Sequence, residues 1–256
     1  MTPRPVALVT GASAGIGREF ATQLARRGHD LVLVARDAGR LAELATQLTQ
    51  SYAAGCEVLV ADLSDRQALQ TVADRLADGA RPVDVLVNNA GFALRRSFLR
   101  SEVADEEASL DVLVRAVLVL SHAAGRAMRE RGRGTIINVS SVAGFVSSGT
   151  YSAAKAWVTA FTEGLALELQ DSGVTATALC PGFTHTEFQE RAGISKPGPD
   201  FIWLDPADLV RDCLRDVDKG RVVSVPGLQY KALVGLLGVL PRPLIRKAGQ
   251  VARRRR

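Results

Sequence analysis

The amino-acid sequence predicts an α/β fold: a doubly wound parallel sheet of about seven strands with helices on both faces, in a single domain. Short β-branched runs alternate with longer stretches of helical period along the chain. The short runs are apolar nearly throughout, as expected of strands that are covered on both faces. The length of 256 residues suits one such domain. The carboxyl ends of the strands should then share one edge, where ligands bind in such folds.

Each predicted element is a run or a periodic stretch in this alternation. The predicted strands are Val6–Thr10, Leu31–Ala35, Val58–Ala61, Val83–Asn88, Thr135–Ser140, Val174–Leu179 and Val222–Val225. The predicted helices are Ile16–Arg27, Ala38–Gln50, Arg66–Ala77, Val103–Glu130, Tyr151–Asp171 and Pro206–Lys219.

The chain divides into a main domain and a C-terminal segment. We expect residues 1–227 to form the α/β domain and residues 228–256 to form an apolar helix followed by a basic tail. Residues 183–205 form a long segment that predicts a substrate loop, since loops of this length are usually functional. Its run Phe201-Ile202-Trp203 either lines a pocket or belongs to the core. We interpret His185, on the same loop, as a solvated residue.

The net charge of +5 comes from the C-terminal tail. Residues 242–256 contain seven basic residues and no acidic one, which leaves 25 basic against 27 acidic residues in the rest of the chain. A nucleic-acid-binding domain would carry its basic residues across a folded face, so no nucleic-acid partner is expected. We expect the apolar stretch 230–240 to pack on a partner subunit or on the chain itself, and the terminal arginines to be solvated. The alternative is a contact of this segment with an anionic membrane surface.

The cysteines and the hydropathy pattern indicate a cytoplasmic protein. Cys56, Cys180 and Cys213 are odd in number and far apart, without a CxxC motif, so we interpret them as reduced thiols. No continuous apolar run reaches the length of about 18 residues that a membrane span needs. The N-terminus does not have the pattern of a signal peptide. No metal site is predicted.

A glycine-rich turn follows the first predicted strand and precedes the first helix. Its glycines, Gly11, Gly15 and Gly17, allow a tight turn and a close approach of backbone N–H groups to a pyrophosphate, as in Rossmann-like folds. The spacing is GxxxGxG and differs from the usual GxGxxG, so a plain glycine turn is the alternative. A Walker A loop is excluded because no Lys-Ser/Thr pair follows. A hydrolase nucleophile elbow is disfavoured because only one strand precedes the turn.

The residue after the second strand indicates the dinucleotide. Arg36 stands where an acidic residue would hold the ribose 2′-hydroxyl of NAD. Its guanidinium suits a 2′-phosphate, so NADP(H) is the favoured cofactor. Asp37 follows immediately and keeps NAD as the alternative.

Tyr151 and Lys155 are candidates for acid–base chemistry. They are four residues apart at the start of a predicted helix, so both side chains should lie on one face. A fixed ammonium close to a phenol lowers the pKa of the phenol, and such a tyrosine could exchange a proton with a carbonyl. Ser141, at the end of a predicted buried strand, could hold the same oxygen. Alternatively, Ser140 and Ser141 merely cap the strand.

With these motifs in their order, the sequence resembles the short-chain dehydrogenase/reductase (SDR) family, in its compact single-domain, NAD(P)-dependent form. The matching pieces cover about 190 residues and are Thr10–Gly17, Ala61–Leu63, Asn88–Gly91, Asn138–Ser141, Tyr151–Lys155 and Pro181-Gly182. The resemblance implies an oxidoreductase that moves a hydride between a nicotinamide and a carbonyl or secondary alcohol. It also implies a homodimer or homotetramer, with contacts through the long helices 103–130 and 151–171.

The resemblance also implies roles for individual residues. Ser141 would position the carbonyl, Tyr151 would donate and accept the proton, and Lys155 would bind the nicotinamide ribose. The cofactor would be held by Gly11, Ser13, Ala14, Gly15, Ile16, Gly17, Arg36, Asp62, Leu63, Asn89, Ala90, Gly91, Tyr151, Lys155, Pro181, Gly182, Thr184 and Thr186. The lining expected around the substrate, which includes Phe92, Leu94 and Phe145, is apolar, so a lipophilic small molecule is the expected substrate.

Two departures from the family pattern affect this interpretation. Leu113 occupies the position at which the family usually has an asparagine that holds a water near the lysine, and a leucine side chain forms no hydrogen bonds. The ten-residue step from Ser141 to Tyr151 is shorter than in many members. The alternative function is therefore a non-catalytic or weakly active dinucleotide-binding protein, membrane-peripheral through its C-terminus.

Overall fold

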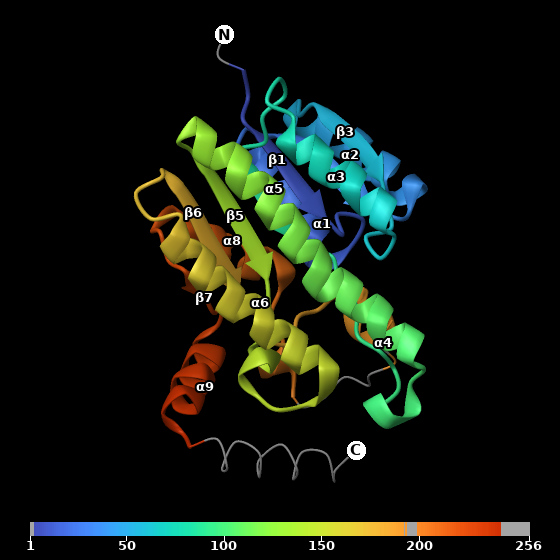
Figure 1. Ribbon diagram of the computed structural model, residues 1–256, viewed down its shortest axis with the longest axis vertical. Coiled ribbons are helices and arrows are strands. Elements are labelled where there is room, and N and C mark those ends of the chain that lie inside the picture. The colour runs from blue at the N-terminus through green and yellow to red at the C-terminus, as the bar shows by residue number, and fades with distance from the viewer. Residues whose placement is uncertain (1–2, 192, 194–198, 242–256) are drawn as a thin grey trace.

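The computed structural model describes residues 3–191, 193 and 199–241. In this part of the chain, seven parallel strands form one sheet in the order β3–β2–β1–β4–β5–β6–β7 (Figure 1). The strands are β1 Val6–Thr10, β2 Asp30–Ala35, β3 Cys56–Val60, β4 Val85–Asn88, β5 Gly134–Val139, β6 Val174–Leu179 and β7 Val223–Ser224. The predicted fold class is confirmed.

Helices connect the strands on both faces of the sheet. The α-helices are α1 Gly15–Arg26, α2 Ala38–Tyr52, α3 Arg66–Ala77, α4 Val103–Leu110, α5 Ala116–Arg131, α6 Gly149–Glu168, α7 Glu187–Arg191, α8 Pro206–Asp218 and α9 Leu228–Val239. The short 3₁₀ turns are η1 Phe98–Arg100, η3 Val142–Phe145 and η4 Asp200–Ile202. The predicted loop 183–205 therefore contains α7 and η4. Its residues 192 and 194–198 lie outside the described residues.

Most element bounds lie within one or two residues of the prediction, and the larger differences have local causes. β3 begins at Cys56 because its pairing with β2 starts there, opposite Leu31. The predicted strand began only at the apolar run from Val58. α6 ends at Glu168, before the predicted Asp171, because Asp171 adopts a left-handed backbone conformation with φ of 62°, which a helix does not accommodate.

Two hydrophobic clusters hold the helices against the sheet. On one face, Phe20 of α1 and Leu44 of α2 pack with Val9 of β1. On the other face, Val72 of α3 and Leu120 of α5 pack with Leu8 of β1. Neighbouring residues of β1 thus face opposite layers, which explains why the predicted strands are apolar throughout.

The helix spanning Val103–Arg131 departs from the sequence analysis in two ways. It was predicted as one α-helix, but Asp111–Arg115 forms a π-helical turn between α4 and α5. The continuous helix is also long and apolar enough to cross a membrane, although no such segment was expected. Half of its most apolar stretch is buried in the fold, where α5 packs against α3 and the sheet. In this structure it is a core helix.

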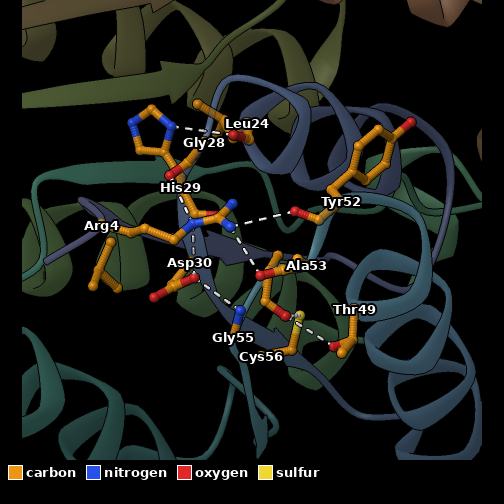
Figure 2. A network of polar contacts seen from close by, with 12 residues as sticks. Arg4, Leu24, Gly28, His29, Asp30, Thr49, Tyr52, Ala53, Gly55 and Cys56 are labelled. Carbon is orange, nitrogen blue, oxygen red and sulfur yellow. Dashed lines mark hydrogen bonds and ion pairs between the residues drawn. The ribbon is translucent and has the colours of Figure 1, made fainter. Parts of the chain in front are cut away.

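An arginine network closes the amino-terminal edge of the sheet (Figure 2). Arg4 donates to the carbonyl oxygens of Gly28 at 3.0 Å and Ala53 at 2.8 Å. It also pairs with Asp30, whose carboxylate accepts the N–H of Gly55 at 2.8 Å. These two carbonyl groups follow the C-terminal ends of α1 and α2, where the helix itself provides no hydrogen-bond donors. The Arg4 guanidinium provides the donors instead. This edge is structural and lies opposite the carboxyl edge of the strands, which is the lower edge of the sheet in Figure 1.

Candidate active site

The glycine turn after β1 has the predicted tight geometry. Gly11 and Gly15 adopt φ angles of +64° and +53°, which favour glycine. A Cβ on Gly17 would lie 2.3 Å from the carbonyl oxygen of Gly11, so no side chain fits there. The turn lies at the switch point of the sheet, because β1 has β2 on one side and β4 on the other. Dinucleotides bind at this point in doubly wound sheets.

The N-terminus of α1 lacks a side-chain cap, whereas its neighbours have one. Ala14 occupies the N-cap position of α1 and provides no side-chain hydrogen bond. Asp37 and Asp65 cap α2 and α3 by accepting backbone N–H groups. The first turn of α1 thus presents N–H groups and the positive end of the helix dipole to the crevice. This arrangement suits a bound pyrophosphate.

Charged residues follow β2 and β3 at the carboxyl edge of the sheet. Arg36 lies 3.7 Å from the carboxylate of Asp62 and is largely exposed. The pKa of Asp62 is lowered: partial burial acts to raise it, but hydrogen bonds from Ser64 and the charge of Arg36 outweigh that effect. The carboxylate of Asp37 caps α2 by accepting the N–H of Arg40 at 3.0 Å. The Asp37 carboxylate is therefore engaged in a helix cap, whereas Arg36 is largely exposed at the end of β2 and forms a 3.7 Å ion pair with Asp62.

Asn89 and Thr10 tie β4 to the glycine turn. The Asn89 amide donates to the carbonyl oxygens of Thr10 at 3.0 Å and Gly11 at 3.3 Å. The Thr10 hydroxyl accepts the N–H groups of Asn89 and Ala90, both at 3.0 Å. These bonds fix the width of the crevice between β1 and β4.

Ser141, Tyr151 and Lys155 converge at the carboxyl end of β5. A hydrogen bond joins the side chains of Ser141 and Tyr151. The Lys155 ammonium lies 5.8 Å from the centre of the Tyr151 ring and donates to the carbonyl oxygen of Val139, the last residue of β5, at 2.7 Å. Ser140 points elsewhere and donates to the backbone of α6 at Lys155, at 2.6 Å. Of the two serines, the geometry favours Ser141 for contact with a reacting oxygen.

Burial determines the pKa values of this pair in the polypeptide. It raises the pKa of Tyr151 to about 12, although the hydrogen bond with Ser141 acts in the opposite direction. Burial also lowers the pKa of Lys155 to about 8. The pKa of Tyr151 in the polypeptide alone is therefore raised, where a lowering by Lys155 was predicted, because removal of the phenol from water is the largest effect on it.

Leu113 fills the space beside Lys155 at which the family pattern has an asparagine. It is fully buried in the π-helical turn. A Cβ on Gly91 would lie 2.9 Å from the Leu113 side chain and 3.8 Å from the Lys155 ammonium. Gly91 is therefore in contact with both groups.

A buried polar network, which the sequence analysis did not identify, connects the strands and helices beneath the site. The Asn88 amide donates to Asn138 at 2.9 Å and to Ser121 at 3.1 Å. The Asn138 amide donates to the Thr162 hydroxyl at 3.0 Å. These residues lie on β4, β5, α5 and α6, so the network fixes α6, which carries Tyr151, relative to the sheet.

The other predicted cofactor residues lie along the same carboxyl edge. They follow β3 (Asp62, Leu63), β4 (Asn89, Ala90, Gly91) and β6 (Pro181, Gly182, Thr184). Thr186 lies over the turn, since a Cβ on Gly15 would be 3.1 Å from its methyl group. Ser13 and Ala14 belong to the turn itself, and Ile16 lies in the first turn of α1. The structure brings the predicted set together at one edge of the sheet.

Segment 183–205 brings aromatic side chains close to one another and to Tyr151. The ring of Phe188 lies 5.9 Å from the ring of Tyr151. The ring of Trp203 lies 5.4 Å from that of Phe183, in a tilted arrangement, and stacks on the ring of His185 at 5.2 Å. Phe201 is 75% exposed, so the alternative that it belongs to the core is wrong. Phe188 was not singled out from the sequence, because no local pattern places it next to Tyr151.

Comparisons with known proteins agree with this geometry. The family model described as short chain dehydrogenase matches residues 5–196. Sulfoacetaldehyde reductase 2 of Chromohalobacter salexigens is 37% identical over 210 residues, which cover 80% of this chain and 82% of the relative.

Solved structures show the same architecture over nearly the whole chain. A short-chain dehydrogenase from Sphingobium yanoikuyae in complex with NADPH superposes with a TM-score of 0.83 and 36% identity, covering 93% of this chain and 97% of the other. A bulky-bulky ketone specific alcohol dehydrogenase from Comamonas testosteroni has a TM-score of 0.79 and 31% identity, with coverages of 93% and 95%. The chain therefore belongs to the short-chain dehydrogenase family of oxidoreductases.

Proposed function

We propose that this protein is an NADP(H)-dependent oxidoreductase that transfers a hydride between the nicotinamide and a carbonyl or secondary alcohol of a lipophilic small molecule. The observation that carries the proposal is the convergence of Ser141, Tyr151 and Lys155 beside the glycine turn. NAD is the alternative cofactor.

The residues around the crevice fit a dinucleotide. The glycines leave a cradle that a Cβ at Gly17 would fill, and the uncapped N-terminus of α1 would hold the pyrophosphate. Arg36 would pair with a 2′-phosphate. Asp62 and Leu63 would border the adenine, and Lys155 the nicotinamide ribose. NADPH in the similar structure from Sphingobium yanoikuyae supports the choice of cofactor. The dinucleotide, when bound, supplies or accepts the hydride.

The proton that is transferred to the carbonyl oxygen would come from a residue of this chain. Because the pKa of Tyr151 lies near 12, the phenol stays protonated at neutral pH and is ready to donate to a carbonyl oxygen. The Ser141 hydroxyl would hold the same oxygen and orient it toward the phenol. The ammonium of Lys155 would favour the phenolate that forms when the proton leaves. In the reverse direction, Tyr151 takes the proton back from the alcohol.

The substrate side supports an apolar substrate. Phe188 lies against Tyr151, and Phe183 packs on Trp203. The similar enzyme from Comamonas testosteroni is specific for ketones with bulky groups on both sides. The charged small substrate named for sulfoacetaldehyde reductase 2 is the competing class. A ketone panel compared with sulfoacetaldehyde would distinguish the two.

Replacement of Tyr151 with phenylalanine tests the mechanism. With NADPH and a panel of apolar ketones, Tyr151→Phe should lower kcat about 10²–10⁴-fold, the usual contribution of one general acid. The Kd for NADPH, measured from nicotinamide fluorescence, should change less than threefold because the glycine turn is intact. Tyr52→Phe, in α2 away from the crevice, is the matched control and should keep full activity. Retention of turnover in Tyr151→Phe would exclude Tyr151 as the proton donor.

The alternative is a weakly active dinucleotide-binding protein at a membrane surface. One observation favours it: α9 exposes Leu228, Leu233, Leu236 and Val239 to solvent, and a tail with seven basic residues and no acidic one follows in the sequence. An apolar surface next to a polybasic segment suits an anionic bilayer. The tail, residues 242–256, lies outside the described residues.

Vesicle sedimentation tests this alternative. The full chain should bind vesicles that contain anionic lipid, lose binding in high salt, and lose it in the variant Leu233→Ser with Leu236→Ser. Absence of binding at low salt would exclude the membrane contact. Turnover across the ketone panel would exclude a non-catalytic role.

Exposed leucines and free cysteines suggest an oligomeric state and a cellular location for this protein. We propose a homodimer or homotetramer that buries the exposed Leu118 of α5 and Leu167 of α6, which light scattering would detect. The three cysteines are free thiols, which supports a cytoplasmic location.

A further inference from the structure

The two ends of segment 183–205 meet in a small backbone junction. Thr184 forms a parallel β-bridge with Leu204. The N–H of Leu204 donates to the carbonyl oxygen of Phe183 at 2.8 Å, and the N–H of His185 donates to that of Leu204 at 3.0 Å. We call residues 183–185 and 202–204 the neck. Because Phe183 and Trp203 pack together within it, the position of the neck determines the position of this aromatic wall.

A tyrosine from the C-terminal helix joins both sides of the neck. The Tyr230 hydroxyl accepts the N–H of Phe183 at 3.0 Å and donates to the carbonyl oxygen of Ile202 at 2.7 Å. Its side chain is 94% buried, since only 6% is exposed. A Cβ on Gly182 would lie 2.0 Å from Cζ of Tyr230, so the ring occupies the space left by that glycine. No other residue of α9 is buried.

We propose that Tyr230 is a positioning residue for the substrate side of the active site. Its hydroxyl holds both sides of the neck at a fixed separation, and its ring holds the Gly182–Thr184 segment against the site. α9 also packs on η3, which lies between Ser141 and Tyr151 in the sequence. The helix therefore contacts both the neck and the segment that connects Ser141 to Tyr151. The consequence for catalysis rests on the proposed function, whereas the contact itself does not.

The hydroxyl matters because it is the partner of two backbone groups. Without it, the N–H of Phe183 and the carbonyl of Ile202 would lose this bond in a partly buried place, which is costly for backbone groups. The neck would then relax, and the aromatic wall formed by Phe183 and Trp203 would change its position. Substrate binding should suffer more than the proton transfer, because the Tyr230 hydroxyl bonds to the backbone of Phe183 and Ile202 in the neck.

Tyr230→Phe isolates the hydroxyl, because the ring still fits against Gly182. With NADPH and the best ketone of the panel, we expect KM for the ketone to rise at least fivefold while kcat changes less than threefold. Tyr52→Phe is the matched control and should leave both constants unchanged. An unchanged KM in folded Tyr230→Phe would overturn the proposal.

A second measurement works whether or not the protein reduces ketones. Trp157 and Trp203 are the two tryptophans of the chain, so Trp157→Phe leaves Trp203 as a reporter within the neck. In that background, Tyr230→Phe should raise acrylamide quenching of Trp203 at least twofold at a temperature at which circular dichroism shows both proteins fully folded. Unchanged quenching would overturn the proposal. If Tyr230→Phe increases the quenching of Trp203 but the parent protein reduces no ketone, the contact between Tyr230 and the neck is supported and only the proposed function is refuted.

The fit between the ring and Gly182 gives a further check. Gly182→Ala should perturb Trp203 quenching strongly because its Cβ meets the ring. When Tyr230→Ala is already present, adding Gly182→Ala should produce little further change. Additive effects of the two substitutions would contradict the contact.

Discussion

Replacing Lys155 with methionine should stabilise the protein at neutral pH, although it removes a residue of the site. Lys155 is 4% exposed, and its burial lowers its pKa from the ordinary 10.5 to about 8. Below pH 8 the lysine is protonated in both the folded and the unfolded chain, so the folded state bears the full cost of a buried charge. Methionine has a similar length and carries no charge.

The pKa values give the magnitude. A difference of 2.5 between 10.5 and about 8 corresponds to about 3 kcal/mol of lost stability below pH 8. Between pH 8 and 10.5 the unfolded chain holds a proton that the folded chain lacks, so the stability of the unsubstituted protein rises with pH. The cost falls to about 1 kcal/mol at pH 9.5. The advantage of Lys155→Met should therefore shrink by about 2 kcal/mol from pH 6.5 to pH 9.5.

Urea unfolding without dinucleotide measures this advantage. The loss of the bond to the Val139 carbonyl lowers the stability of the variant by about 1 kcal/mol, but that contribution does not depend on pH. Lys219→Met, on the surface at the end of α8, is the matched control. If the difference in the free energy of unfolding between Lys155→Met and the parent is the same at both pH values, the charge of Lys155 is not destabilised by burial and the reasoning fails.

The remaining predictions concern the cofactor crevice and the packing beside Lys155. Arg36→Ala should raise the Kd for NADPH roughly 10–100-fold, the contribution of a charged hydrogen bond, and leave the Kd for NADH nearly unchanged in a fluorescence titration; equal effects on both would argue against a 2′-phosphate contact. Arg40 and Glu187 form an ion pair at 3.0 Å that joins α2 to α7, so Arg40→Glu and Glu187→Arg should each speed NADPH release about two- to fivefold in stopped-flow measurements. The double exchange should restore the rate, and failure to do so would refute the pairing. Leu113→Asn should lower the free energy of unfolding by about 2–4 kcal/mol, because it buries an amide where an apolar side chain fills the space; an unchanged urea midpoint would show that the site already accommodates a polar group.

The local parts of the fold could be read from the sequence. The bounds of β1, β6 and α3 agree with the prediction, because each begins and ends at a pattern that lies within a few residues. The same holds for the glycine turn, whose Gly11 and Gly15 adopt the positive φ angles that such a turn requires. Parallel pairing then brings the strand ends to one edge without further information.

Contacts between residues far apart in the sequence could not be predicted from local sequence patterns. Nothing near Tyr230 in the sequence indicates that its hydroxyl bonds to Phe183, which is 47 residues away. The pair Arg40 and Glu187 is separated by 147 residues. The π-helical turn around Leu113 also has no signal in an apolar periodicity that continues through it.

The sequence by itself determined which chemical groups reach the carboxyl edge of the sheet, because strand order along the chain and the four-residue step from Tyr151 to Lys155 are local properties. Only the tertiary structure decided the ionisation of these groups. The pKa of Tyr151 rises and that of Lys155 falls, because a pKa depends on how completely the surrounding elements remove water from the group. That degree of burial arises only when β5, α6 and the π-helical turn pack together.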